Sequence, residues 1–326
     1  MNTTFARMMS GAVAVVALAG TASASSEPVV DSALPTYKVA QGVAGEVKFV
    51  GSDSMLTLST HWAEEFTKLY PSVGKSVEGK GSSTAPTALI EGTATFGPMS
   101  RPMKSEETDK FEKKFGYKPT GLRVAIDCLA IFVNKDAPIA EISIEQAKAI
   151  FSVDGKDMTW GDLGVTNADW ASKPLALYGR NSSSGTYGYF KEHVLGKKDF
   201  KPTVKEQPGS SGVINAIATD KFAIGYSAIG YRTADVKALK VKKTAKDAAF
   251  APSAENAYSG EYPVARFLMV YINKKPGEAL PPVQVEMVKM MFSRQGQEGV
   301  LKDKLIPVTA DIAREDLKAA GVTPGF

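Results

Sequence analysis

Residues 47–70 read VKFVGSDSMLTLSTHWAEEFTKLY, and this stretch indicates the fold class. The apolar run Val47–Val50 is typical of a short buried strand, which ends at Gly51. A helical pattern follows from about Met55 to Tyr70, where a proline stops it. Strand, Gly/Ser loop and helix therefore follow one another, which is the repeating unit of an α/β fold.

The same order of elements recurs along the chain. A predicted strand at 75–78 precedes a second Gly/Ser loop and a short helix to about residue 91. Another strand, 176–178, leads through a third such loop to an aromatic helix at 187–195, and a further strand is expected at 93–97. This recurrence favours an α/β fold with a mainly parallel sheet.

Two long apolar stretches, Arg123–Val133 and Arg266–Asn273, differ from these short units. We expect both to form strands that cross from one lobe of the molecule to another. A mature chain of 302 residues can bury two cores, and its length favours two lobes.

The N-terminus has the parts of a secretory signal peptide. Arg7 supplies a positive charge, and the apolar run 11–19 is too short to span a bilayer. Small residues at 22–24 suit a cleavage site, so residues 1–24 are the expected signal peptide. Residues 25–44 are small and polar and contain prolines, and we expect them to precede the fold. The mature protein would then be free in the periplasm of a Gram-negative cell, or secreted.

Charge and composition argue against several classes of protein. Loss of the leader leaves 38 of the 39 basic residues against 35 acidic residues, a balance too even for a nucleic-acid binder. Cys128 is the single cysteine, so no intrachain disulfide can form, and its apolar surroundings predict a buried thiol. The two histidines, His61 and His193, have no partner at metal-ligand spacing. We therefore expect no metal and no cofactor.

The signatures of common enzymes are missing from the sequence. No Gly-x-Ser-x-Gly elbow and no nucleotide-binding Gly-x4-Gly-Lys-Ser/Thr loop occurs. A Ser-x-x-Lys match at 72–75 lacks its companion motifs. We expect a binding protein without catalytic residues.

Three loops share one design: Gly51–Ser54, Gly81–Thr84 and Ser182–Thr186 each follow a strand and open a helix. The first turn of a helix leaves N–H groups without partners, and the helix dipole favours an anion there. Glycine permits close approach, and hydroxyl groups add neutral donors. Ordinary helix capping by Ser, Thr or Asp is the alternative for each loop taken singly.

Arg180 is the fixed charge beside the third loop. A guanidinium group can hold two oxygens of a phosphate or sulfate at once. Three hydroxyl-rich loops together with this arginine favour a site for a tetrahedral oxyanion over three unrelated helix caps.

The chain resembles the phosphate-binding proteins of phosphate ABC transporters, the periplasmic receptors that deliver phosphate to a membrane permease. The resemblance covers nearly the whole mature chain. It rests on GSDSM at 51–55 before WAEEF at 62–66, on GKGSS at 79–83, and on GTATFG at 92–97 with SRP at 100–102. Further matches are Arg180-x3-Ser-Gly-Thr186, AIGY at 223–226 and RFLMVYIN at 266–273.

The resemblance implies a type II periplasmic-binding-protein clamp with two lobes, each a mixed sheet flanked by helices. Two crossing strands would join lobe 1 (25–130 and 268–326) to lobe 2 (131–267), and the receptor would act as a monomer. By the same resemblance, inorganic phosphate would lie between the lobes and pass to an ABC permease. The candidate phosphate-binding residues are Ser52, Asp53, Ser54, Met55, Ser82, Ser83, Ser100, Arg101, Asp127, Arg180, Ser184, Gly185 and Thr186.

The sequence departs from the family at two acidic positions. Well-known members carry an aspartate where this chain has Ser100, and that carboxylate accepts the proton of hydrogen phosphate. Ser182 replaces a second acid. Asp127 and Asp53 are the remaining candidates for the acceptor, and we favour Asp127 because an acid in an apolar strand needs a partner. The alternative is that Asp127 is structural and either caps a loop or pairs with Arg101 or Arg123.

This departure keeps two other functions open. The same clamp could be tuned to another oxyanion, such as sulfate or molybdate. It could also serve phosphate sensing or adhesion without tight binding, since a fold does not fix a function.

Overall fold

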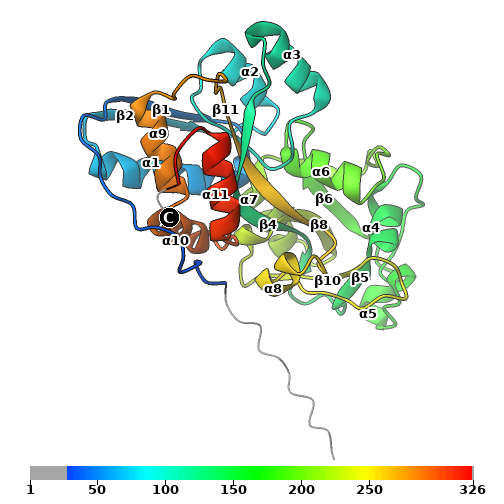
Figure 1. Cartoon of the computed structure of the whole chain (residues 1–326). Coiled ribbons are helices and arrows are strands. Elements are labelled where there is room, and N and C mark those ends of the chain that lie inside the picture. The colour runs from blue at the N-terminus through cyan, green and yellow to red at the C-terminus, as the bar shows by residue number, and fades with distance from the viewer. Residues whose placement is uncertain (1–27, 325–326) are drawn as a thin grey trace, which may run out of the picture.

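The structure is a computed structural model that describes residues 28–324 (Figure 1). The expected signal peptide, residues 1–24, lies outside the described residues. Helices and strands alternate along the chain, so the predicted α/β class is confirmed. None of the described helices is both long and apolar enough to cross a membrane.

The largest sheet is mixed, with strand order β3-β11-β4-β8-β6-β7 and β9 paired to β4. Strands β6, β7 and β8 are parallel, whereas β4 is antiparallel to β8, β9 and β11. The expectation of a mainly parallel sheet is therefore wrong for its centre, because the two long strands run against their neighbours. The strands are β3 (Gly97–Met99), β4 (Thr120–Asn134), β6 (Ala176–Arg180), β7 (Lys205–Gln207), β8 (Ala223–Ala228), β9 (Val236–Ala238) and β11 (Ala265–Ile272).

Two parallel strand pairs lie outside this sheet. Strand β1 (Gly45–Val50) pairs with β2 (Val73–Glu78), and an isolated bridge from Phe49 to Phe96 links β1 to the chain just before β3. Strand β5 (Glu141–Ser143) pairs with β10 (Lys240–Lys242). In Figure 1 these pairs lie at opposite ends of the molecule, with β4 and β11 running between them.

Helices lie on both sides of the line that β4 and β11 follow through the molecule (Figure 1). Helix α1 buries Leu58, Trp62 and Phe66, which recur every four residues and therefore share one face. The expected capping box at α4 is confirmed, because Ser143 and Gln146 exchange hydrogen bonds. The helices are α1 (Leu56–Leu69), α2 (Thr84–Glu91), α3 (Ser105–Phe115), α4 (Ile144–Phe151), α5 (Ala168–Ala171), α6 (Gly185–His193), α7 (Gly209–Thr219), α8 (Ala254–Tyr258), α9 (Pro282–Met291), α10 (Arg294–Lys302) and α11 (Ala310–Ala319), with 3-10 turns η1 (Asp53–Met55), η2 (Gly161–Leu163) and η3 (Ile229–Tyr231).

The apolar interior divides into two large clusters along the central strands. The first cluster contains Trp62, Ala125 and Leu268 and is built around β1, α1 and α9–α11. The second contains Ile126, Trp160 and residues of β6 and β8. The division in β4 falls between two consecutive residues, so a single strand contributes to both clusters. The predicted burial of Cys128 is confirmed, and burial raises the pKa of its thiol.

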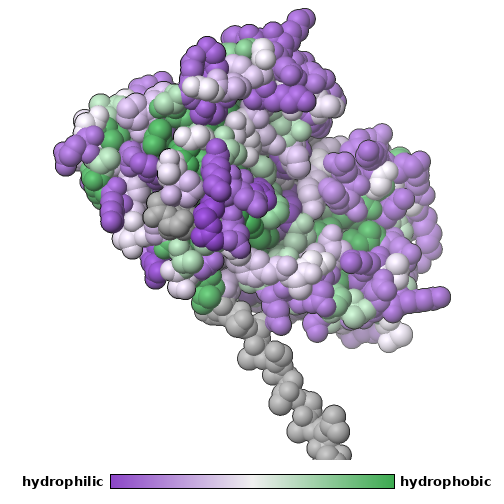
Figure 2. Space-filling view, in the orientation of Figure 1, coloured by the Kyte–Doolittle hydropathy of each residue, from purple (hydrophilic) through white to green (hydrophobic). Residues whose placement is uncertain are grey.

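Residues 28–44 pack onto the fold, so the expectation that they simply precede it is wrong. Leu34 is buried, and Asp31 accepts a hydrogen bond from the backbone N–H of Ala310. Tyr37 donates to Glu286 and lies 2.5 Å, oxygen to oxygen, from the hydroxyl of Tyr70. The segment looks like a linker in the sequence because its few anchors are spread among small residues. The visible surface is mostly hydrophilic, with apolar residues in small patches (Figure 2).

Candidate anion-binding site

The first Gly/Ser loop runs from the end of β1 into η1. The Oγ of Ser52 donates to the Oγ of Ser100 at 3.0 Å, and the hydroxyl of Ser54 lies 2.9 Å from that of Thr186. Met55 is fully buried in the first apolar cluster, so its side chain contributes to the core. Its N–H donates to the carbonyl of Ser52.

The second loop, before α2, joins the first through Ser82. The Oγ of Ser82 accepts from the backbone N–H of Ser100 at 3.0 Å and lies 3.3 Å from its hydroxyl. Ser83 faces the third loop instead, where its hydroxyl and N–H both donate to the carbonyl of Ser183. The two loops therefore meet, although about 100 residues separate them in the chain.

The third loop carries Ser184, Gly185 and Thr186 at the start of α6. A Cβ atom on Gly185 would lie 2.6 Å from the Oγ of Ser100 and closer still to that of Ser82. Real Cβ atoms do not approach so closely, so this contact between loops needs glycine. Ser184 accepts from the N–H groups of Thr186 and Tyr187 as a helix cap. Ser52, Ser83 and Met55 begin their helices without such a side-chain bond.

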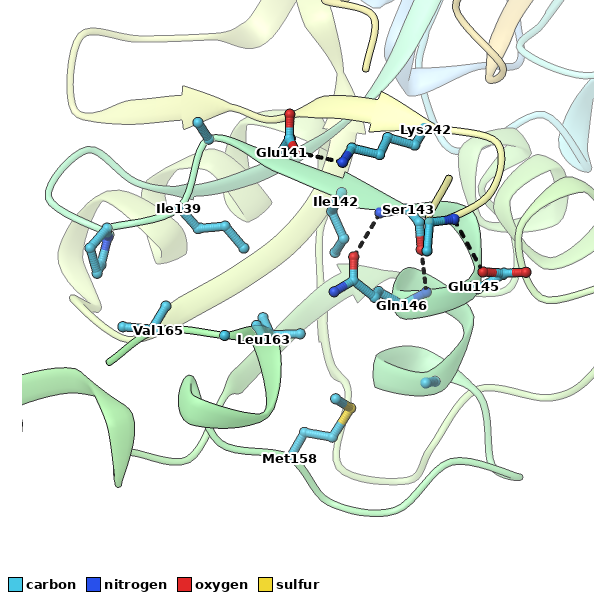
Figure 3. Close-up of a pocket in the computed structure, with 15 residues that line it drawn as sticks. Ile139, Glu141, Ile142, Ser143, Glu145, Gln146, Met158, Leu163, Val165 and Lys242 are labelled. Atoms are coloured by element: carbon cyan, nitrogen blue, oxygen red, sulfur yellow. Dashed lines mark hydrogen bonds and ion pairs between the residues drawn. The ribbon is translucent and has the colours of Figure 1, made fainter. Parts of the chain in front are cut away.

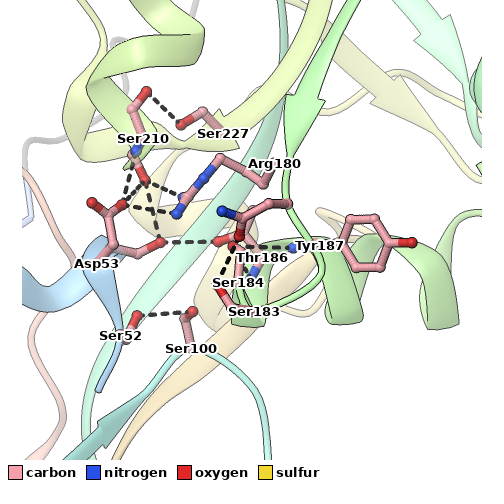
Figure 4. A network of polar contacts seen from close by, with 12 residues as sticks. Ser52, Asp53, Ser100, Arg180, Ser183, Ser184, Thr186, Tyr187, Ser210 and Ser227 are labelled. Atoms are coloured by element: carbon pink, nitrogen blue, oxygen red, sulfur yellow. Dashed lines mark hydrogen bonds and ion pairs between the residues drawn. The ribbon is translucent and has the colours of Figure 1, made fainter. Parts of the chain in front are cut away.

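A fourth loop, which the sequence analysis missed, completes the network shown in Figure 4. Helix α7 begins at Gly209, directly after the short strand β7, and Ser210 is fully buried at its first turn. The N–H and hydroxyl of Ser210 both donate to Oδ1 of Asp53, at 2.8 and 3.0 Å. The sequence Pro-Gly-Ser-Ser-Gly at 208–212 could have indicated this loop, because it resembles the other Gly/Ser loops and follows a strand, although that strand has only three residues, all polar.

Arg180 lies at the centre of this network. Its side chain is 3% exposed, its Nη1 donates to the hydroxyl of Ser210 at 2.8 Å, and its Nη2 lies 3.1 Å from Oδ1 of Asp53. Its buried Nε has no hydrogen-bond partner among the described residues. Burial lowers the pKa of the guanidinium from its ordinary value, against the opposing effect of Asp53. A buried, incompletely partnered cation is the local condition that an anion would relieve.

Tyr231 closes one side of the network. Its hydroxyl donates to the backbone carbonyl of Asp53 at 3.0 Å, and burial raises its pKa to about 12. The phenol therefore remains a neutral donor at physiological pH.

Two predicted site residues have partners of their own. Arg101 forms a two-pronged ion pair with Glu107, at 2.8 and 2.7 Å, which engages both terminal nitrogens of the guanidinium. Asp127 is fully buried and receives Nε and Nη2 of Arg266 on Oδ2, at 3.1 and 2.8 Å, and the N–H of Ile229 on Oδ1. The structural alternative named the wrong arginine, since Asp127 pairs with Arg266 rather than with Arg101 or Arg123, but Oδ1 of Asp127 does accept a backbone N–H from the turn η3, that of Ile229.

Among the described residues, neither a cluster of metal-ligand side chains nor the larger cavity coincides with this site. In the part of the chain that the structure describes, no group of three His, Cys, Asp or Glu side chains could hold a metal ion. The groove in Figure 3, about 610 Å³, is lined by residues of β5, α4 and the chain around Val165, and it includes no predicted site residue. A smaller cavity of about 220 Å³ reaches Ser54 and lies between Tyr231 and residues 302–305.

The chain is similar to known proteins in sequence and in fold. The chain matches the PBP superfamily domain over residues 22–286. It is 49% identical over 310 residues to the phosphate-binding protein PstS of Pseudomonas aeruginosa, covering 93% of this chain and 96% of the relative. PstS of Staphylococcus saprophyticus is 31% identical over 234 residues, 71% of each chain. An ABC-type phosphate transport receptor from Vibrio cholerae shares the fold, with a TM-score of 0.64 and 21% identity over 80% of this chain and all of that one.

Proposed function

The chain belongs to the phosphate-binding proteins of the PBP superfamily, and from this premise we propose that it captures inorganic phosphate outside the cytoplasm and delivers it to an ABC permease. It is a binding protein rather than an enzyme. The observation that carries the proposal is the buried guanidinium of Arg180, with an unpartnered Nε, among hydroxyl groups from four loops. A periplasmic location and a monomeric state complete the proposal.

The division of the apolar interior into two clusters fits a mechanism in which two lobes close on the phosphate. Apart from Ile306, which packs in the second cluster, the two apolar clusters support one lobe of residues 28–125 with 268–324 and a second of residues 126–264. The bonds Ser54–Thr186, Asp53–Ser210 and Asp53–Arg180 would then join the lobes, while β4 and β11 serve as the hinge. Opening would separate the loops, and closure would bring donors from both lobes onto the anion.

The number of donors sets the binding free energy that the site can supply. A micromolar site needs about 8 kcal/mol of binding free energy. A hydrogen bond to a charged group contributes about 1.5–3 kcal/mol, so four or five converging donors contribute about 6–15 kcal/mol, a range that spans this figure before the cost of ordering is subtracted. Arg180, Ser54, Ser82 and the first turn of α6 are the donors that we assign to phosphate.

The proton of hydrogen phosphate needs an acceptor, and two carboxylates remain candidates. Asp127 has both oxygens engaged, by Arg266 and by Ile229. The described bonds of Asp53 all end on Oδ1, which leaves Oδ2 as an open acceptor. We therefore favour Asp53 over Asp127. Ser100 is neutral and can donate as well as accept, so it cannot by itself reject fully ionised sulfate.

Binding of another oxyanion is the second candidate function, and Ser100 is the observation that favours it. Sulfate and molybdate carry no proton near neutral pH, and a site whose hydroxyls all donate would accept them as readily as phosphate. The two functions predict different selectivity.

Calorimetric titration of the exported protein with phosphate, arsenate, sulfate and molybdate at two pH values tests the proposal. We expect phosphate and arsenate to bind in the micromolar range or tighter, and sulfate at least about tenfold more weakly. Sulfate or molybdate binding more tightly than phosphate would replace the proposal with the second function. Failure to bind any of the four anions would contradict both. The Arg123→Ala variant is the matched control, because Arg123 pairs with Glu315 and Asp316 rather than with the hydroxyl network.

A further inference from the structure

Arg266 is a buried cation at the junction of the two apolar clusters. It lies on β11 directly opposite Asp127 on β4, and its side chain is 1% exposed. Its neighbours in the chain divide between the clusters, with Val264 in the second and Leu268 in the first. A charge in this position is costly unless its donors are matched.

One edge of the guanidinium is fixed by protein groups. Nε and Nη2 donate to Oδ2 of Asp127, and Cζ of the guanidinium lies over the ring of Tyr189, 5.3 Å from its centre. The hydroxyl of Tyr189 is held in turn by the carbonyl of Ala265. Asp127 and Tyr189 therefore set the direction of the remaining N–H groups.

The other edge of the guanidinium points toward the anion-binding network. The second hydrogen of Nη2 donates to Oγ1 of Thr186 at 2.9 Å, and Thr186 also lies 2.9 Å from the hydroxyl of Ser54. The guanidinium is planar and its terminal N–H groups on Nη1 and Nη2 lie side by side. A donor of Nη1 is therefore directed to the same region as Thr186, and Nη1 is buried without a partner among the described residues.

We propose that Arg266 is a second guanidinium that binds the anion, donating from Nη1 to an oxygen held beside Thr186. Asp127 is then its counter-charge rather than a proton acceptor. This inference rests on the proposed function and adds a ligand contact from the crossing strand to those of the loops. The chemistry suits a doubly charged tetrahedral oxyanion, because two cations approach it from different elements while Asp53 and Asp127 balance their charge in its absence.

Calorimetric titration with inorganic phosphate, after thermal unfolding in phosphate-free buffer has established that each variant folds, tests the role of Arg266. Arg266→Lys keeps the charge and loses Nη1. The double variant Arg266→Met with Asp127→Leu replaces the buried pair by apolar side chains of similar size, which proteins often tolerate. Arg123→Lys is the control, because Arg123 also pairs with an aspartate through Nε and Nη2, namely Asp316, and none of its described bonds reaches the network.

We expect both Arg266 variants to bind phosphate at least about tenfold more weakly, as loss of a charged donor implies, and the control to bind within about twofold of the wild type. Affinity within about threefold of wild type in the folded double variant would overturn the inference, because a purely structural pair can be removed as a unit. The double variant decides the question if Arg266→Lys does not fold. Wild-type protein that fails to bind phosphate would instead contradict the proposed function, and the inference with it.

Discussion

Two arginine–aspartate pairs differ in how completely they are satisfied. Arg123 is 29% exposed and donates from Nε and Nη2 to Asp316 and Glu315, and its bond to Asp316 raises its pKa. Arg180 is almost fully buried beside Asp53, and burial lowers its pKa. The partly exposed Arg123 has N–H groups within reach of water, whereas the buried Nε of Arg180 has no partner among the described residues. An incomplete buried cation is therefore better evidence for a ligand than an ion pair as such.

The largest expected effect is a difference in phosphate affinity between variants of Arg180 and Arg123. Arg180→Ala should cost about 2–5 kcal/mol of phosphate binding, because truncation removes a charged donor from a desolvated site. Arg123→Ala should leave phosphate affinity unchanged and lower only thermal stability. Calorimetry checks both variants. A less than threefold loss of affinity in Arg180→Ala would remove this arginine from the site.

The next effect concerns the approach of the third loop to the second. Gly185→Ala should weaken phosphate binding by about 1–3 kcal/mol, because the new methyl group would overlap the hydroxyls of Ser82 and Ser100. Gly212→Ala is the control, since its Cβ would meet nothing nearer than 3.4 Å. Titration of both variants measures the difference. Equal affinities would show that the loops do not need to meet around the anion.

The preference for phosphate over sulfate distinguishes the roles of Asp53 and Asp127, the two carboxylates that pair with arginine in or beside the site. Asp53→Asn should reduce the preference for phosphate over sulfate by about 1–2 kcal/mol, because sulfate no longer faces an unpaired carboxylate. The ratio of the two dissociation constants is the appropriate measurement, since the loss of the Arg180 pair affects both anions. A ratio that falls in Asp127→Asn and not in Asp53→Asn would return the acceptor role to Asp127.

The smallest expected effect lies at Asp303, a carboxylate outside the network. Its Oδ2 is buried without a partner among the described residues, and burial raises its pKa to about 6. A raised folded-state pKa favours the protonated form, so this group stabilises the fold at low pH and that contribution is lost as pH rises through about 6. Asp303→Asn should therefore raise stability by less than about 1 kcal/mol at pH 8, with the gain vanishing near pH 4. Thermal unfolding at both pH values checks this, and a larger gain at pH 4 would contradict it.

Local patterns in the sequence anticipated the loops but not their partners. Gly51–Ser54, Gly81–Thr84 and Ser182–Thr186 could be recognised because each lies between a strand and a helix, and the structure brings the third loop into contact with both of the others. The loop before α7 escaped notice because its strand, Lys205–Gln207, is short and polar.

The pairing of charges could not be predicted, because it depends on contacts distant in sequence. Asp127 meets Arg266 only through the antiparallel register of β4 and β11, which shifts between Leu268 and Met269. Arg101 turns to Glu107 because α3, a helix that we did not predict, presents that carboxylate. Hydrophobic periodicity gives no information about such registers.

The crystal structure of the protein with phosphate is the most direct measurement of where the anion binds. We expect the phosphate to contact the guanidinium of Arg180 and the first turn of α6, with donors from the loop of Ser54 and from Ser82 on its other side. Phosphate bound in the groove beside β5, or on a surface reached by only one of these loops, would contradict the convergence of loops on a single anion.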